Sequence, residues 1–334
     1  MWIDRYLGSY AGKTVLVTGG AGAIGSNLSR VLSQLGTREV VIVDDLSSSY
    51  EWNVPRANNI TFVKGDILDD HVLKDVFKSK PEYVFHLAAH FANQNSVERP
   101  EKDLMINGMG ILKVLNNCVY PELSRFVYSS SGCGVYGLDS KMPFDESDVS
   151  LKLFTPYQVT KLLGELYSNY FHNLYKVPTV NARFFNSYGP GEVPGKYRNV
   201  IPNFFYWSMQ GKSLPITGTG EETRDFTNVL DIINGLLALG IEDEAIGEAV
   251  NLGTSVETRI IHLANSVNRI TGSSAGYFLS KPREWDKKKR LRASIEKARR
   301  VIGYEPGMDF TKGLAMTGSW FRDNWKEIKS SAEF

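Results

Sequence analysis

The feature that most constrains the fold is a glycine-rich turn between an apolar run and a helical pattern near the start of the chain. The run KTVLVTG leads into VTGGAGAIG, which places Gly19, Gly22 and Gly25 three residues apart, and SNLSRVLSQLG comes next with helical spacing. Glycines let a backbone turn tightly and approach a pyrophosphate closely, while the N-terminus of the helix offers free N–H groups and a positive dipole end. The turn therefore predicts a dinucleotide-binding strand–helix–strand unit.

Further apolar runs alternate with segments of helical spacing through the first half of the chain. This rhythm is typical of a parallel sheet with right-handed crossovers. The runs are apolar throughout, as expected for strands that are covered on both faces. They read EVVIVDD, ITFVKGD, YVFHLAA, RFVYSSS and, after a helical pattern from about Pro156 to Lys176, TVNARFF. We therefore predict an α/β fold with a Rossmann-type doubly wound parallel sheet.

The later part of the chain differs in composition. Between Asn186 and Asp225 the sequence is rich in Gly, Pro, Asn and aromatic residues. Loops of that length inside a compact domain are usually functional. We expect residues 1–180 to form the dinucleotide-binding domain, and residues 181–334 to form mainly a smaller C-terminal substrate-binding lobe with some segments returning to the sheet.

Asp44 ends the second apolar run, 19 residues after Gly25 (44 − 25). A carboxylate at this point can accept hydrogen bonds from the ribose hydroxyls of a bound dinucleotide and repels a 2′-phosphate, so it favours NAD over NADP. Asp45 is a weaker candidate for the same role. Asp66 ends the third run, where it could lie near the adenine or act as a helix N-cap.

Tyr157 and Lys161 stand four residues apart in a predicted helix, within TPYQVTKLLGEL. That spacing places both side chains on one face, within reach of one ligand. The charge of Lys161 favours the phenolate and is expected to lower the pKa of Tyr157 from its usual value near 10. Such a tyrosine can take a proton from a sugar hydroxyl.

Composition narrows the remaining possibilities. A formal net charge of +1 gives no reason to expect a nucleic-acid or membrane partner. No apolar run approaches the roughly 20 residues of a membrane span, and the first residues do not resemble a signal peptide. Two cysteines, Cys118 and Cys133, cannot build a dense disulfide framework, so we expect a cytoplasmic protein. We predict no metal site.

Several motifs occur together in a specific order and spacing. The glycine turn, Asp44, HLAA, YSSS…VYG, YQVTK, RFFNSYGPG, TGTGEETRDFTNVLDI and SIEKARRVIGYEP extend over nearly the whole chain. In this combination the sequence resembles the extended short-chain dehydrogenase/reductases, specifically the NAD-dependent nucleotide-sugar epimerase/dehydratase family, and is similar to its UDP-glucose 4-epimerases.

The resemblance implies a catalytic serine, tyrosine and lysine in the first domain. Tyr157 and Lys161 match the family pattern directly, and the serine falls on Ser131, with Ser130 as the second candidate because one residue is inserted before Val135. The residues implied to bind NAD are Gly19, Gly22, Ala23, Ile24, Gly25, Asp44, Asp66, Ile67, Leu87, Ala88, Ala89, Tyr157 and Lys161.

The same resemblance implies contacts to a nucleotide sugar, with a UDP-sugar favoured. Arg224 would pair with the diphosphate, the alternative being an ion pair with Asp225 or Glu222. The implied substrate-binding residues are Ser130, Ser131, Cys133, Asn186, Asn199, Val200, Arg224 and Arg283. The family also implies a homodimer, formed by the helix after Asp103 and the helix that carries Tyr157.

The chemistry depends on the residues that come directly after the serines. The 4,6-dehydratases of this family carry Asp-Glu there, and the UDP-glucuronate decarboxylases carry a glutamate, whereas this chain has Gly132, Cys133 and Gly134. Elimination would lack its proton carrier, but epimerisation at C4 needs none. The resemblance therefore implies a 4-epimerase of UDP-hexoses, UDP-N-acetylhexosamines or UDP-hexuronates, acting through a 4-keto sugar with hydride return to the opposite face.

Different activities of the same family stay open. The GDP-mannose 3,5-epimerases carry Ser-Ser-Ala-Cys, which is similar to Ser130–Cys133, so Cys133 is either an inert thiol or an acid/base in C3/C5 epimerisation. A dehydratase, a net dehydrogenase and a non-catalytic dinucleotide-binding regulator also stay open. The polar residues Asn93, Gln94 and Ser96 could read the sugar, and His90 could do so or simply pack.

Overall fold

A parallel sheet of seven strands organises the molecule. The computed structural model describes residues 2–284 and 286–334. From one edge to the other, the strands are β3 (Ile60–Lys64), β2 (Glu39–Asp44), β1 (Thr14–Thr18), β4 (Tyr83–His86), β5 (Arg125–Ser131), β6 (Thr179–Phe184) and β11 (Ala249–Leu252). The strand order reverses between β1 and β4, which is the arrangement of a doubly wound dinucleotide-binding sheet. The predicted fold class is confirmed.

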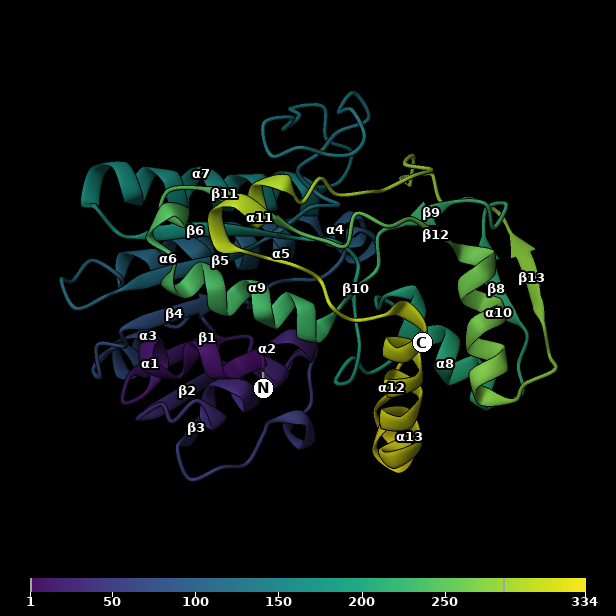
Figure 1. The fold of residues 1–334 in the computed structure, drawn as a ribbon, viewed down its shortest axis with the longest axis horizontal. Coiled ribbons are helices and arrows are strands. Elements are labelled where there is room, and N and C mark those ends of the chain that lie inside the picture. The colour runs from purple at the N-terminus through teal and green to yellow at the C-terminus, as the bar shows by residue number, and fades with distance from the viewer. Residues whose placement is uncertain (1, 285) are drawn as a thin grey trace.

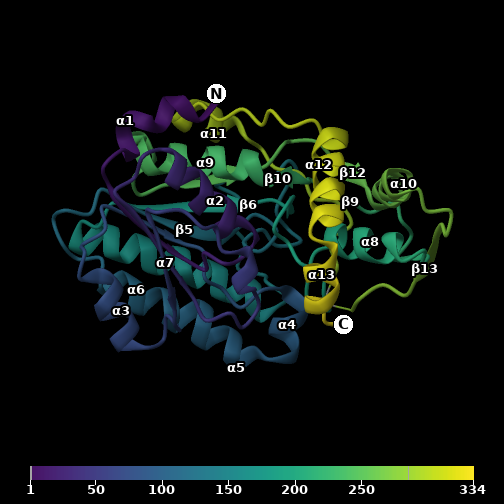
Figure 2. The same ribbon diagram turned by 90° about the horizontal axis from the view of Figure 1, so that it is seen from below.

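Helices cover both faces of the sheet, as Figure 2 shows. One face carries α2 (Ala23–Gln34), α9 (Val229–Ile241) and α11 (Glu296–Ile302), with η1 (Trp2–Tyr6) and α1 (Leu7–Tyr10) from the N-terminus. The other face carries α3 (Asp70–Phe77), α4 (Asn93–Glu98), α5 (Pro100–Asp103), the π-helical turn η3 (Leu104–Met109), α6 (Gly110–Asn116) and α7 (Pro156–Tyr175). Apart from the edge strand β3, which is partly exposed, the strands are buried on both sides, and this explains why their sequences are mostly apolar.

A smaller lobe lies beside the carboxyl ends of the strands (Figure 1). It contains α8 (Val200–Met209), β8 (Leu214–Thr217), α10 (Ile260–Thr271), α12 (Phe310–Asp323) and α13 (Trp325–Ser331), which share a core of their own. The exposed strand β13 (Tyr277–Ser280) pairs with β8 at the edge of this lobe. Four short strands lie where the chain passes between the two parts: β7 (Ser187–Tyr188), β9 (Thr223–Arg224), β10 (Thr227–Asn228) and β12 (Thr258–Arg259). Two 3-10 turns, η2 (Glu51–Asn53) and η4 (Asp243–Ala245), belong to the sheet domain. Because ligands of doubly wound sheets bind at the carboxyl ends of the strands, the lobe faces the expected site.

The start of α7 is fixed by its sequence. The hydroxyl of Thr155 accepts a hydrogen bond from the backbone N–H of Gln158, whose side-chain oxygen accepts in return from the N–H of Thr155, at 3.2 Å. Pro156 occupies the first turn, where no N–H is required. Tyr157 and Lys161 therefore project from the first two turns of a firmly capped helix. Within residues 2–284 and 286–334, no helix has both the length and the apolarity to cross a membrane.

Candidate active site

Tyr157, Lys161 and Ser131 come together at the carboxyl end of β5. Tyr157 is buried, and its hydroxyl interacts with the side chain of Ser131. The ammonium of Lys161 lies 5.7 Å from the centre of the Tyr157 ring and donates to the backbone oxygen of Ser129 at 2.7 Å. One strand thus supplies the serine and anchors the lysine, while α7 supplies both the tyrosine and the lysine.

The structure separates the two candidate serines. The hydroxyl of Ser130 donates to the carboxylate of Glu165, which is also bound by Arg183 at 2.8 Å and 2.9 Å. Ser131 instead contacts Tyr157. This geometry favours Ser131 as the catalytic hydroxyl and gives Ser130 a place in a buried ion-pair network.

Burial dominates the electrostatics of the tyrosine–lysine pair. Desolvation raises the pKa of Tyr157 above its ordinary value, and the hydrogen bond from Ser131 offsets only part of this rise. The sequence-based expectation of a lowered tyrosine pKa is therefore wrong for the protein alone, because a buried phenolate loses its hydration. Burial also lowers the pKa of Lys161 to about 8, against the opposing effect of the Asp103 carboxylate.

Asp103 is the nearby carboxylate that sequence reasoning missed. It is fully buried; Oδ2 accepts from the hydroxyl of Thr160 at 2.6 Å and Oδ1 accepts from Nδ2 of Asn107 at 2.9 Å. Asn107 also holds the backbone of His90, since its Oδ1 accepts from the His90 N–H at 2.8 Å. Asp103 and Asn107 are four residues apart in an otherwise apolar helical pattern. This polar pair is the signal in the sequence that could have pointed to a buried carboxylate here. The π-helical turn begins immediately after Asp103.

The polar segment after β4 lies beside this network. Both ring nitrogens of His90 are buried without a hydrogen-bond partner among the described residues, and Nδ1 is 3.8 Å from Asp103 Oδ1. Asn93 Oδ1 accepts from the hydroxyl of Thr155 at 2.7 Å. Gln94 and Ser96 bond within their own helix, to Glu98 Oε1 and the backbone oxygen of Asn93. Their predicted roles in reading the sugar stay predictions.

The glycine turn forms a cradle that fits NAD. A Cβ on Gly19 would lie 2.6 Å from the backbone nitrogen of Ala88, and one on Gly25 would lie 2.3 Å from the backbone oxygen of Gly19. Gly19 also has a φ of +69°, which favours glycine. Gly22 caps α2 without a side chain, so the first N–H groups of the helix, including those of Ala23 and Ile24, face the turn.

Asp44 lies at the end of β2, beside this cradle. Its Oδ2 accepts from the backbone N–H of Ala21 at 3.0 Å and its Oδ1 accepts from the hydroxyl of Ser49 at 2.6 Å, so the carboxylate shapes the turn. Asp45 is exposed and accepts from the N–H of Ser47. Asp44 is therefore the better placed of the two adjacent aspartates.

The remaining predicted cofactor residues lie at the same edge of the sheet. Leu87, Ala88 and Ala89 come directly after β4, and the Ala88 N–H donates to the hydroxyl of Thr18 at 3.3 Å. Asp66 is exposed and Ile67 is buried after β3. The N-cap alternative for Asp66 is wrong, because Asp66 accepts from the N–H of Leu68 while Asp69 caps α3.

The predicted substrate contacts lie on both parts of the molecule. Asn186 comes after β6, and its Oδ1 accepts from the Cys133 thiol at 3.4 Å. Asn199 caps α8, which begins at Val200, and its Nδ2 donates to Glu192 Oε1 at 3.0 Å. Burial raises the pKa of Glu192 to about 7.

The two predicted arginines differ in their surroundings. Arg224 pairs with Asp286 at 3.1 Å and is mostly buried, whereas Arg283 lies on an exposed segment. The alternative of an Arg224 ion pair with Asp225 or Glu222 is wrong. Asp225 instead accepts from the backbone N–H groups of Thr254, Ser255 and Ala293, and Glu222 accepts from Thr219 and Gly220.

Cys133 lies between the catalytic residues and the predicted substrate contacts. Desolvation raises the pKa of its thiol above the ordinary value, although Asn186, Lys288 and Arg224 act in the opposite direction. A thiol that stays protonated at neutral pH favours the inert interpretation over acid/base work.

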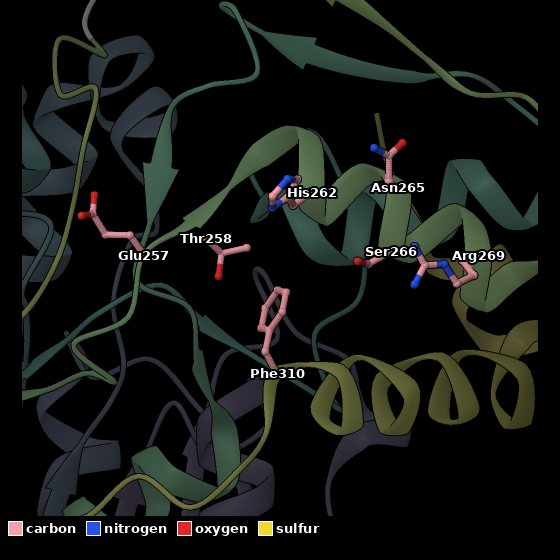
Figure 3. A pocket seen from close by; sticks show the side chains of 7 residues that line it. All are labelled: Glu257, Thr258, His262, Asn265, Ser266, Arg269 and Phe310. Carbon is pink, nitrogen blue, oxygen red and sulfur yellow. The ribbon is translucent and has the colours of Figure 1, made fainter.

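One cavity of the molecule lies away from the predicted site. Figure 3 shows this cavity of about 460 Å³ on the smaller lobe, lined by Glu257, Thr258, His262, Asn265, Ser266, Arg269 and Phe310. It contains none of the predicted site residues. A much smaller cavity lies at the glycine turn and includes Ala21, Gly22, Ala23, Ser48, Ser49, Tyr50, Asn53, Gly191, Glu192, Val193 and Arg198. Of the predicted cofactor residues, Gly22 and Ala23 line this smaller cavity.

Solved structures show the same arrangement of the whole chain. Epimerase Mth375 from Methanothermobacter thermautotrophicus is 62% identical, with a TM-score of 0.98 over 100% of this chain and 99% of that one. The enzyme WbmF from Bordetella bronchiseptica, solved in complex with NAD+ and UDP, is 35% identical, with a TM-score of 0.83 and 96% coverage of both chains.

Sequence comparison identifies the family. The UDP-glucose 4-epimerase of Mycolicibacterium smegmatis is 33% identical over 311 residues, which cover 92% of this chain and 98% of that protein. The profile of the NAD dependent epimerase/dehydratase family matches residues 15–253. The chain therefore belongs to the NAD dependent epimerase/dehydratase family, and NAD is its cofactor.

Proposed function

We propose that the protein is a nucleotide-sugar 4-epimerase that acts on a UDP-hexose, UDP-N-acetylhexosamine or UDP-hexuronate. The observation that carries the proposal is the contact between Tyr157 and Ser131 beside Lys161, with Gly132, Cys133 and Gly134 next in the chain in place of carboxylates. Three buried carboxylates near this group bind protein partners: Asp103, Glu165 and Asp225. Proton transfer at the sugar then falls to the hydroxyls.

In this proposal the residues of the chain bind the sugar and move one proton. Tyr157 takes the proton of the sugar O4 hydroxyl and later returns it, while Ser131 hydrogen-bonds the same oxygen and orients it. Lys161, held by the backbone oxygen of Ser129, supplies the positive charge that favours the phenolate. NAD, when bound, accepts hydride from C4 and gives it back. Because no proton leaves C5 or C6, the product has the mass of the substrate.

The test is NMR of the purified protein with NAD and a panel of UDP- and GDP-sugars, following the anomeric and C4 protons. We expect a C4-inverted product of unchanged mass with at least one UDP-sugar. Tyr157→Phe should lower turnover by roughly 10²–10⁴-fold and leave NAD binding nearly intact. Accumulation of a keto or dehydrated product, or wild-type turnover by the phenylalanine variant, would overturn the proposal.

C3/C5 epimerisation is the alternative on which the protonation of Cys133 bears most directly. It would require Cys133 as a thiolate, whereas burial raises the pKa of this thiol. Cys133→Ala is therefore expected to retain 4-epimerase activity. Loss of activity together with solvent deuterium at C3 or C5 of the product would favour the alternative.

We also propose the division of labour and the assembly expected from the sequence. Residues 1–180 would carry the cofactor and the catalytic residues, and residues 181–334 mainly the nucleotide sugar.

A homodimer is supported by a set of exposed apolar side chains on η3 and α7: Leu104, Met105, Met109, Val159, Leu166 and Tyr170. Light scattering should give twice the chain mass, and Leu166→Glu should give a monomer. A wild-type monomer at micromolar concentration would refute the dimer.

A further inference from the structure

Lys288 is an unexpected cation beside the candidate active site. It lies in the run Lys287, Lys288, Lys289, Arg290, whose other three members are exposed. Its ammonium donates to the backbone oxygen of Cys133 at 3.0 Å and also to the backbone oxygen of Tyr136. The run as a whole looks like a solvated surface, but one lysine of it reaches inward to the turn after Ser131.

The charge of this ammonium has no carboxylate partner in the part of the chain that the structure describes. Asp286 influences Lys288 electrostatically, but it pairs with Arg224 at 3.1 Å. The two acceptors that Lys288 does have are neutral carbonyls, and its ammonium lies over the ring of Phe144, 5.5 Å from the ring centre. An ammonium has three N–H donors, so one donor is left for a ligand.

The pKa of Lys288 shows that burying this ammonium without a carboxylate partner is unfavourable. The pKa of Lys288 is lowered to about 8, mainly by burial and to a smaller extent by Arg224, while Cys133 and Asp286 act in the opposite direction. A buried cation that lacks an anion is unfavourable, and a bound anion removes that penalty. The site is therefore better suited to a negatively charged ligand group than to a neutral one.

The position of Lys288 indicates which ligand group this is. Lys288 donates to the backbone oxygen of Cys133, two residues after Ser131, and the side chain of Ser131 interacts with Tyr157. The ammonium is therefore bonded to the turn that directly follows the catalytic serine. In a hexuronate the carboxylate is attached to C5, the carbon next to C4. A group that binds this carboxylate must therefore lie close to the residues that bind O4, and Lys288 is bonded to the turn that follows one of them, Ser131.

We propose that Lys288 recognises a carboxylate on the sugar and that nucleotide hexuronates are the preferred substrate class. This inference rests on the proposed function, because it assumes that a nucleotide sugar binds with O4 at Tyr157. A neutral hexose leaves the ammonium without a counter-charge, whereas a hexuronate supplies it together with a hydrogen bond.

The test measures binding by calorimetry, so that it does not depend on turnover. UDP-glucuronate, UDP-glucose and UDP are titrated into the NAD-bound wild type and into Lys288→Met, with Lys289→Met as the exposed neighbouring control. We expect the wild type to bind UDP-glucuronate at least about 10-fold more tightly than UDP-glucose, and Lys288→Met to lose about 100-fold in affinity for UDP-glucuronate. Its affinities for UDP-glucose and UDP should change less than about threefold. Lys289→Met should bind all three like the wild type.

Any other result of these titrations overturns the proposal that Lys288 recognises a sugar carboxylate. An equal loss for all three ligands would place Lys288 at the diphosphate or in the stability of the turn, and no loss for UDP-glucuronate would remove it from recognition. If Lys288→Met does not fold, Lys288→Arg and the wild-type preference decide: the arginine should keep most of the hexuronate preference, and a wild type that binds UDP-glucose as tightly as UDP-glucuronate refutes the proposal. Binding without turnover would refute the 4-epimerase instead.

Discussion

The ion pair between Arg183 and Glu165 lies buried beneath the candidate site. Arg183 donates to both oxygens of Glu165, through Nε at 2.9 Å and Nη2 at 2.8 Å, and the two side chains are 3% and 5% exposed. Arg183 also donates to the Tyr136 hydroxyl at 3.0 Å, and Ser130 donates to Glu165. Although burial opposes the arginine charge, the bonds to Glu165 outweigh it and raise the pKa of Arg183.

Glu165→Gln should therefore destabilise the protein strongly. It removes the negative charge and leaves a buried guanidinium without compensation, which costs about 3–5 kcal/mol of unfolding free energy. Glu165→Leu combined with Arg183→Met removes both charges, so the double variant should be at least about 2 kcal/mol more stable than the sum of the single effects predicts. Some cost remains because the hydroxyls of Ser130 and Tyr136 lose partners.

The assay is equilibrium unfolding in urea for the wild type, the single variants and the double variant. Glu296→Gln provides a matched control, because its ion pair with Arg299 is exposed and should change the unfolding free energy by less than about 0.5 kcal/mol. A cost below about 1 kcal/mol for Glu165→Gln, or a double variant that costs the full sum of its parts, would refute this account of the ion pair.

Three further predictions concern pH and the cofactor. Because burial holds the pKa of Lys161 at about 8, kcat should fall as the pH rises through that value. The Asp103 carboxylate raises the pKa of Lys161, so Asp103→Asn should move this fall to lower pH by about one unit. An unchanged pH–rate profile for this variant would contradict the electrostatic effect of Asp103 on Lys161. Burial lowers the pKa of His86 from 6.5 to about 3, so between these pH values the unfolded chain binds a proton that the folded protein does not. The unfolding free energy of the wild type should therefore drop by about 2–3 kcal/mol between pH 7 and pH 4.5. The drop should be smaller in His86→Gln. Asp44→Asn should reduce the preference for NAD over NADP in binding titrations by about tenfold, and an unchanged ratio would show that the carboxylate only shapes the turn.

The sequence predicts those features that depend on local patterns. Each apolar run became a strand of the sheet, and the helix expected from about Pro156 to Lys176 spans Pro156–Tyr175 with Lys176 as its left-handed cap. The glycine turn was equally readable, because its spacing reflects steric limits at Gly19 and Gly25. Such signals lie within a few residues of one another.

The features that sequence reasoning missed depend on distant contacts. Lys288 meets Cys133 across 155 positions of the chain, and nothing in a run of basic residues distinguishes the member that turns inward. The direction of the Tyr157 pKa was misjudged for a related reason: the charge of Lys161 can be read from the spacing, but the desolvation of the phenol cannot. The choice between Ser130 and Ser131 likewise needed the position of Glu165.

The inner face of α7 explains why the candidate site is rigid as well as reactive. Thr160 is bound to Asp103, Lys161 to the backbone of β5, and Glu165 to Arg183, while at Gly164 a Cβ would lie 2.2 Å from the Tyr128 hydroxyl. These contacts fix the helix against α5, β5 and β6, and the three polar contacts also give buried groups their hydrogen-bond partners.

Tyr157 differs from its neighbours on this face. Its hydroxyl interacts with another neutral hydroxyl, that of Ser131. Ser131 can change its hydrogen-bond partner without leaving a buried charge unpaired. A substrate hydroxyl can therefore join this pair, while the rest of the helix stays anchored. Substitutions at Thr160 or Glu165 should thus weaken catalysis by moving α7, whereas substitutions at Tyr157 and Ser131 should remove the chemistry and leave the fold intact.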